Sequence, residues 1–96
     1  MPAYVHINMR VVDPARQAAL FPRFQATLQE VGGRILHFGP VVKVLEGEEK
    51  PLPLAGVFEF PSLSAALAFY DSEEYAPIKA ERRLAQEARM FVVDAT

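Results

Sequence analysis

AYVHINMRV, the segment from residue 3 to residue 11, alternates between apolar and polar side chains. The apolar positions are Ala3, Val5, Ile7, Met9 and Val11, and the polar ones are Tyr4, His6, Asn8 and Arg10. A period of two with β-branched residues predicts a strand that has one face against a core. Asp13-Pro14 follows and is typical of a helix start, because aspartate accepts hydrogen bonds from free backbone N–H groups and proline suits the first turn.

The helix predicted after Pro14 continues to Gly32-Gly33, where glycine can adopt the left-handed conformation that ends many helices. Apolar residues recur at helical spacing along it, at Leu20, Phe24, Leu28 and Val31. Pro22 lies inside the segment and lacks the N–H group for one backbone hydrogen bond. We therefore expect a kink or a restart of the helix at this position.

The rest of the chain predicts further strands and two more helical stretches. Extended segments are predicted over residues 34–38, 41–46, 54–60 and 90–95. Gly39-Pro40 separates the first two of these segments as a turn or a bend. Residues 47–53 form a charged loop bounded by prolines. Ser62 can cap a helix with Leu63, Ala66, Leu67 and Tyr70 on one side, and Ser72 can cap a second stretch from Glu73 to about Ala88.

If residues 34–46 form one strand bent at Gly39-Pro40, and the stretches after Ser62 and Ser72 form one broken helix, the order is β-α-β-β-α-β, the split order of ferredoxin-like α+β folds. We expect one domain over residues 1–96, with an antiparallel sheet covered by two helices on one face and open on the other. In this topology the first strand lies centrally, beside the third and the last. The predicted core between helices and sheet consists of Ile7, Leu20, Phe24, Leu28, Phe58 and Leu67.

Composition excludes several classes of function. Apolar residues make up 51% of the chain and charged residues 23%, which indicates a globular domain with apolar surface to spare. The net charge of −2 argues against nucleic-acid binding, and the absence of cysteine excludes disulfides and thiolate chemistry. No apolar run approaches the roughly 20 residues that cross a bilayer, and no signal peptide is recognisable, so a cytoplasmic location is expected. A homodimer through the open sheet face would cover the spare apolar surface.

Several short motifs together resemble a known family. They are Met1-Pro2-Ala3-Tyr4, Asp13-Pro14, Gly32-Gly33-Arg34, Leu45-Glu46-Gly47, Glu59-Phe60-Pro61-Ser62, Phe69-Tyr70-Asp71-Ser72, Glu74-Tyr75 and Arg82-Arg83. In order and spacing they resemble the domain-of-unknown-function family numbered thirteen-thirty, within the dimeric α/β-barrel superfamily. The resemblance covers nearly the whole chain and implies a ferredoxin-like fold and a dimer. It implies no established reaction and therefore assigns no catalytic residue.

Polar residues on the open sheet face are the first candidates for a ligand site. His6 and Asn8 belong to the first strand, His37 to the second, and Glu59 to the third. A carboxylate beside histidine and asparagine in a half-buried pocket could accept a proton, since burial and neighbours shift pKa values towards neutrality. The alternative is a set of polar residues that are hydrogen-bonded at a dimer interface. No metal site is expected, because the histidines lack the spacing of metal ligands.

A second candidate set comprises Tyr70, Tyr75 and either Arg82 or Arg83. Tyr75 and Arg82 are seven residues apart, about two helical turns, so they share one helix face. A phenol and a guanidinium together could hold an acidic or carbonyl ligand. The alternative is that the tyrosines border the core and the arginines are solvated.

Three functions remain open from the sequence. The first is the binding of a small metabolite in the barrel pocket of a dimer. The second is a small-molecule enzyme, for example one like the cofactor-independent monooxygenases that share the superfamily fold. The third is a structural or interaction dimer without a ligand. The sequence has no phosphate-binding loop, nucleophile elbow or dinucleotide fingerprint, so no cofactor is expected.

Overall fold

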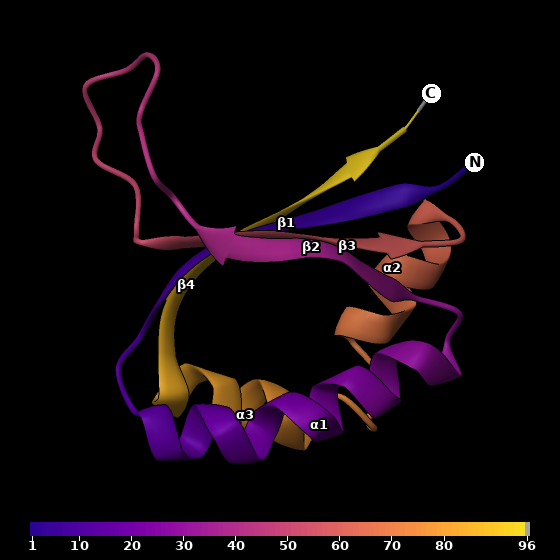
Figure 1. Cartoon of the computed structure of the whole chain (residues 1–96). Coiled ribbons are helices and arrows are strands. Elements are labelled where there is room, and N and C mark those ends of the chain that lie inside the picture. The colour runs from indigo at the N-terminus through magenta and orange to yellow at the C-terminus, as the bar shows by residue number, and fades with distance from the viewer. Residues whose placement is uncertain (96) are drawn as a thin grey trace.

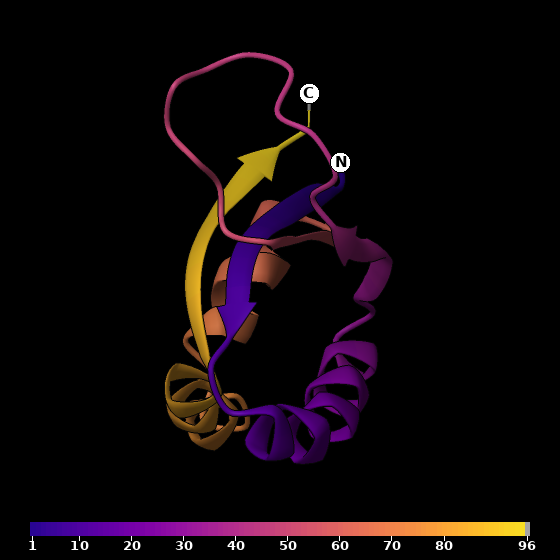
Figure 2. The same cartoon turned by 60° about the vertical axis from the view of Figure 1, so that its left-hand side comes forward.

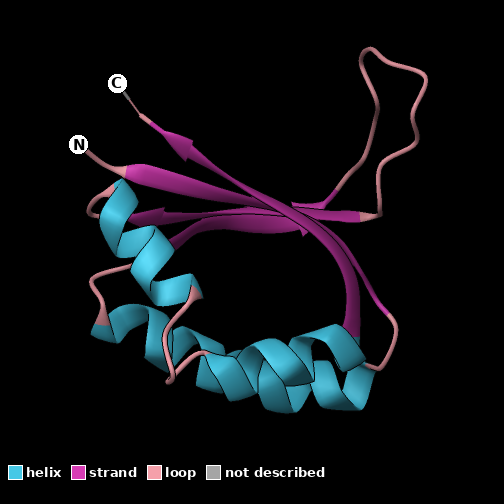
Figure 3. Cartoon of the chain, turned by 180° about the vertical axis from the view of Figure 1, so that it is seen from behind, coloured by secondary structure: helices cyan, strands magenta, loops and turns pink. Residues whose placement is uncertain are grey.

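The computed structural model describes residues 1–95, and its helices lie together on one face of a four-stranded sheet (Figure 1). The elements in chain order are β1 (Ala3–Val11), α1 (Pro14–Glu30), β2 (Arg34–Pro40), β3 (Leu54–Phe60), α2 (Leu63–Tyr70), α3 (Ala76–Ala85) and β4 (Gln86–Asp94). Seen from behind, the sheet again forms one layer and the helices the other (Figure 3). The predicted ferredoxin-like α+β fold is confirmed.

The sheet is antiparallel, with the strand order β2-β3-β1-β4. β1 therefore lies between β3 and β4, as the topology predicted. Tyr4 of β1 is opposite Glu59 of β3, and Val11 at the other end of β1 is opposite Gln86. Because β4 pairs with β1 along its whole length, β4 begins at Gln86, four residues before the predicted start at Met90.

The alternation in β1 gives the sheet one buried and one open face. Ala3, Ile7 and Met9 are buried beneath the helices, whereas Arg10 is exposed on the other side. Two of the three predicted caps form, at the starts of α1 and α2. The Asp13 carboxylate accepts a hydrogen bond from the Arg16 backbone N–H at 3.1 Å, and the Ser62 hydroxyl accepts one from the Ala65 N–H at 3.1 Å.

Aromatic rings form the centre of the core. Phe24 lies 5.0 Å from Phe58, and Phe69 lies 4.6 Å from Tyr75 and 5.3 Å from Phe60, measured between ring centroids. Of the six predicted core residues, Ile7, Leu20, Leu28 and Phe58 are buried, and Phe24 packs against them while partly exposed. Leu67 was predicted wrongly, since 48% of it is exposed. α2 turns Ala66 and Phe69 inward instead.

Three predicted boundaries are also corrected. α1 continues through Pro22, so the helix does not restart there. α3 begins at Ala76 and not at Glu73, because Ser72 caps a turn over residues 73–75 and Pro77, which has no N–H group, fits only the first turn of a helix. The second helical stretch also ends at Ala85, three residues before the predicted end.

Residues 41–53 form a long loop that contains no strand, although residues 41–46 were predicted to be extended. A strand needs a hydrogen-bonded neighbour, and this segment has one backbone bond to its own base, from the Val41 N–H to the Pro53 carbonyl at 2.8 Å. The loop projects from the sheet on the side away from the helices (Figures 1 and 2). None of the helices within residues 1–95 combines the length and apolar character that crossing a bilayer requires.

Candidate functional site

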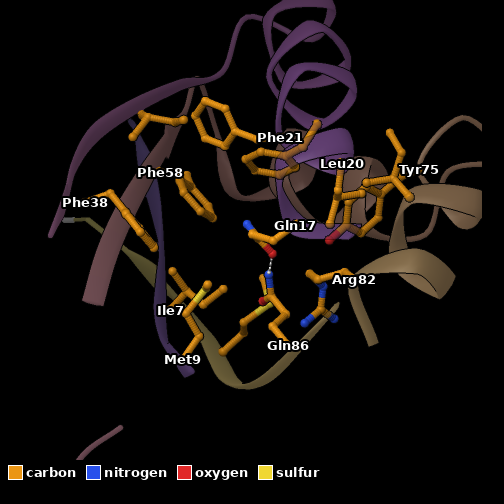
Figure 4. Close-up of a pocket in the computed structure, with 14 residues that line it drawn as sticks. Ile7, Met9, Gln17, Leu20, Phe21, Phe38, Phe58, Tyr75, Arg82 and Gln86 are labelled. Atoms are coloured by element: carbon orange, nitrogen blue, oxygen red, sulfur yellow. Dashed lines mark hydrogen bonds between the residues drawn. The ribbon is translucent and has the colours of Figure 1, made fainter. Parts of the chain in front are cut away.

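A pocket of about 310 Å³ lies between the helix-covered face of the sheet and helices α1 and α3 (Figure 4). It is lined by Ile7, Met9, Gln17, Leu20, Phe21, Phe24, Ile35, Phe38, Phe58, Tyr75, Ile78, Arg82, Gln86 and Met90. All four strands and the two helices α1 and α3 contribute to this set. The pocket is therefore a product of the complete fold and not of one local motif.

The walls are mostly apolar. The lining residues recur at the spacing that places side chains on one face of a strand or a helix. Alternate residues of the strands face the pocket, such as Ile7 and Met9 in β1. On α1 the lining residues 17, 20, 21 and 24 recur at helical spacing. Gly56 makes room for the Phe38 ring, because a Cβ atom at residue 56 would lie 2.6 Å from Phe38 Cδ2. Glycine in β3 thus allows an aromatic side chain of β2 to form one wall.

Four polar residues meet at one end of this apolar pocket: Gln17, Tyr75, Arg82 and Gln86. Gln86 Nε2 donates a hydrogen bond to Gln17 Oε1 at 2.9 Å, which joins the start of β4 to α1 (Figure 4). Gln86 is only 7% exposed, and its Oε1 has no donor within residues 1–95. The buried Nε of Arg82 likewise has no acceptor there. One acceptor and one charged donor thus remain available in the same region.

Tyr75 is fully buried at the start of α3 and lines the pocket. Burial raises the pKa of its phenol above the ordinary value, while the nearby positive charge of Arg82 acts in the opposite direction. Burial has the larger effect, so the hydroxyl stays protonated at neutral pH and is available as a hydrogen-bond donor.

The structure brings two of the residues in the second predicted set together in this pocket. Tyr75 is the N-cap residue of α3 and Arg82 lies in its last turn, and both side chains line the pocket, consistent with the predicted shared face. Tyr70 does not line it, but its ring centroid lies 5.8 Å from that of Tyr75, and Lys79 Nζ lies 4.0 Å above the Tyr70 ring. Tyr70 instead borders a neighbouring groove that also includes Arg82, Arg83 and Gln86.

On the open face, Asn8 holds the base of the long loop. Its Nδ2 donates to the carbonyl oxygens of Leu52 and Leu54 at 2.9 and 2.8 Å, and its Oδ1 accepts from the Leu52 N–H at 2.9 Å. These three bonds use both amide hydrogens and the oxygen. The side chain acts as a clamp between β1 and the chain that leads into β3.

Glu59 lies on the open face as predicted, but at the opposite end from Asn8. The residue facing Glu59 is Tyr4, and Asn8 is four residues farther along β1, about 13 Å away. The structure therefore does not bring Asn8 and Glu59 into one pocket. Arg34 Nε donates to Glu59 Oε1 at 2.8 Å, and this hydrogen bond lowers the pKa of the carboxyl group.

The two histidines share the open face without contacting each other. His6 and His37 are both opposite Val57, on either side of β3, which places them two strand spacings apart, about 10 Å. His6 stacks on Phe91 with ring centroids 5.0 Å apart and planes 4° apart, and His37 is exposed. No group of three His, Asp or Glu residues within residues 1–95 is arranged to hold a metal ion.

The sequence of the chain matches a known protein family over nearly its whole length. A family model described as a domain of unknown function, DUF1330, matches residues 2–96. The chain belongs to the DUF1330 family. The resemblance predicted from the motifs is confirmed, and the DUF1330 match extends over all the elements that build the pocket. No curated protein matches the chain.

Solved structures share the fold at low sequence identity. RPA0582, a protein of unknown function from Rhodopseudomonas palustris, is 17% identical with a TM-score of 0.75, over 99% of this chain and 82% of that one. A dimeric ferredoxin-like protein of unknown function from Jannaschia sp. CCS1 is 11% identical with a TM-score of 0.72, over 99% and 100%. SnoaB, a cofactor-independent oxygenase from Streptomyces nogalater, is 12% identical with a TM-score of 0.71, over 99% and 93%.

Proposed function

We propose that this DUF1330 protein is a homodimer that binds a small, largely apolar metabolite in the pocket between the sheet and helices α1 and α3. The observation that carries the proposal is a pocket of about 310 Å³ that is lined by apolar side chains and has polar groups at one end. Ligand sites have this character, and their volumes begin at roughly 300 Å³. The proposal places the ligand on the helix side of the sheet, whereas the sequence suggested the open face.

The size of the pocket also supports binding. The pocket is open to solvent, and Phe21 and Phe38 on its walls are 43% and 44% exposed. Covering such apolar surface is favourable by roughly 25 cal/mol per Å². A ligand that fills the pocket would remove this apolar lining from water.

The lining residues favour binding over catalysis. The set includes hydrogen-bond donors in Tyr75 and Arg82 but no aspartate, glutamate or histidine among its described members. General base catalysis needs a group that accepts a proton within hydrogen-bond reach of the substrate, and carboxylates and imidazoles most often fill that role. The oxygenase activity of SnoaB belongs to a protein that is 12% identical, and we do not extend it to this chain.

The ligand pocket can be tested with paired substitutions at neighbouring residues of β2. Ile35 lines the pocket, and Leu36 is exposed beside it at an irregularity in the strand. Ile35→Trp is expected to weaken the binding of indole, a neutral aromatic probe, by about tenfold or more because the larger ring fills the pocket. Leu36→Trp should leave the affinity unchanged. Titration calorimetry measures both, and circular dichroism checks that each variant is folded.

If both variants, Ile35→Trp and Leu36→Trp, bound indole as tightly as the unaltered protein, indole would bind outside the pocket. Failure of indole and similarly small apolar probes to bind the unaltered protein would count directly against a binding function.

The open face supports the second part of the proposal, the homodimer. Phe91 and Val93 of β4 are exposed there, opposite His6 and Tyr4 of β1. The long loop projects on the same side of the sheet (Figure 1) and carries Val42 and Leu45, which are almost fully exposed. An apolar face of this extent is rare on a monomer. The fold is shared with a protein from Jannaschia sp. CCS1 that is described as dimeric.

Replacing Phe91 with alanine is expected to weaken the dimer. Phe91 is 62% exposed in the single chain, and losing a buried aromatic side chain from an interface would cost about 2 kcal/mol, equivalent to roughly a thirtyfold higher dissociation constant. The control is Leu84→Ala on α3, which is 55% exposed on the helix side and should leave the dimer intact. Sedimentation equilibrium measures both. A monomer of 10.7 kDa for the unaltered protein at micromolar concentration would contradict the homodimer.

A further inference from the structure

We infer that the ligand of the pocket is an organic monoanion, a carboxylate or a chemically similar enolate, with an apolar body. This inference rests on the proposed function. The anionic oxygen lies between Arg82 and the Tyr75 hydroxyl, and the apolar body lies among the phenylalanine rings. Three features of the polar end of the pocket support this assignment.

The first feature is an arginine without a counter-ion. Ion pairs within residues 1–95 involve Arg10, Arg16, Arg34 and Arg89, each with an aspartate or a glutamate, and none involves Arg82. The Nε of Arg82 is buried and has no acceptor there. A buried N–H group without an acceptor is costly, and a carboxylate matches the planar guanidinium with short, charge-assisted hydrogen bonds.

The second feature is which of the neighbouring groups donate hydrogen bonds and which accept them. The Tyr75 hydroxyl stays protonated and can donate to an anionic oxygen. Gln86 Oε1, by contrast, is a buried acceptor without a donor. This oxygen would repel a second carboxylate but can accept a hydrogen bond from a hydroxyl group of the ligand. One cation beside one unpaired carbonyl oxygen therefore favours a ligand with a single negative charge.

The third feature is the position of Arg82 between two hollows. Arg82, Gln86 and Met90 line the apolar pocket and also an adjacent groove of about 290 Å³, which Arg83 and Tyr70 border. An anionic head group at Arg82 would lie next to this polar groove, so that it keeps part of its hydration. The apolar body would extend towards the phenylalanine side, where burial is favourable.

Two probes of nearly the same shape test the assignment: phenylacetate, which is an anion, and phenylacetamide, its neutral counterpart. Phenylacetate is expected to bind the unaltered protein about tenfold more tightly than phenylacetamide. Arg82→Gln should remove this preference, and Arg82→Lys should retain part of it. Arg23→Gln, at an exposed arginine of α1 that lines neither the pocket nor the groove, should leave the preference in place. Titration calorimetry gives the four ratios.

The possible outcomes separate this inference from the proposed function. Equal affinity of the unaltered protein for both probes would overturn the anionic ligand, while binding in the pocket would stand. If the unaltered protein bound neither these two probes nor indole, both the proposed function and this inference would be wrong. The comparison in the unaltered protein needs no variant, so a folding defect in Arg82→Gln does not affect it. A preference that persists in folded Arg82→Gln would also overturn the role of Arg82.

Discussion

Replacing Phe60 with alanine is expected to lower the free energy of unfolding by about 3–5 kcal/mol. Phe60 is 1% exposed on the helix side of β3, and its ring centroid lies 5.3 Å from that of Phe69. Truncation removes apolar contacts and leaves a cavity among rings that cannot collapse freely. Because small domains have about 5–15 kcal/mol of stability in total, the variant should unfold at much lower denaturant concentration.

Urea unfolding at a fixed protein concentration measures this loss, since dimerisation makes the apparent stability depend on concentration. The control is Leu67→Ala in α2, where the side chain is 48% exposed and the loss should stay below about 1 kcal/mol. Similar losses for the two variants would mean that α2 buries a different face from the one in the structure.

The fold was predictable because local signals and burial agree along most of the chain. In β1 the apolar positions alternate with polar ones, and the structure buries Ala3, Ile7 and Met9 beneath the helices, with Val5 and Val11 partly buried beside them. Asp13 and Ser62 mark helix starts in the sequence and form the corresponding hydrogen bonds. Such agreement between patterning and capping is what lets one sequence specify one topology.

The errors occur where the local pattern has no unique solution. α2 is apolar on nearly every side, so helical periodicity does not distinguish Leu67 from Phe69 as the inward residue. The segment from Val41 to Leu45 has the composition of a strand, but β2 and β3 pair only as far as Pro40 and Leu54. A strand needs a partner, and the local sequence does not indicate whether one exists.

The pocket could be predicted only in part. The spacing of Tyr75 and Arg82 indicated a shared helix face, and both residues are in the pocket. Gln17 and Gln86 were missed, because they are 69 positions apart and come together only when α1 packs against the start of β4. The one local signal was Gln17 itself, a polar residue on the inward side of an apolar helix pattern.

Replacing Asn8 with alanine is expected to destabilise the protein by about 2–4 kcal/mol. The side chain makes three hydrogen bonds to backbone groups of Leu52 and Leu54 in a partly buried place, and each such bond contributes about 0.5–1.5 kcal/mol. Truncation also leaves the backbone partners unpaired. Arg10→Ala, two residues along the same face, is the control. Its exposed ion pair with Glu87 should contribute less than about 1 kcal/mol.

The same variant distinguishes a structural role of Asn8 from a ligand contact. The amide already uses its hydrogens and its oxygen to bind the base of the loop, on the face of the sheet opposite to the pocket. Asn8→Ala should therefore shift the urea midpoint and leave the affinity for indole unchanged, under conditions where the variant is folded. An affinity that falls without a change in unfolding would instead place the ligand on the open face beside Asn8, because a clamp acts on stability and a binding residue acts on the complex.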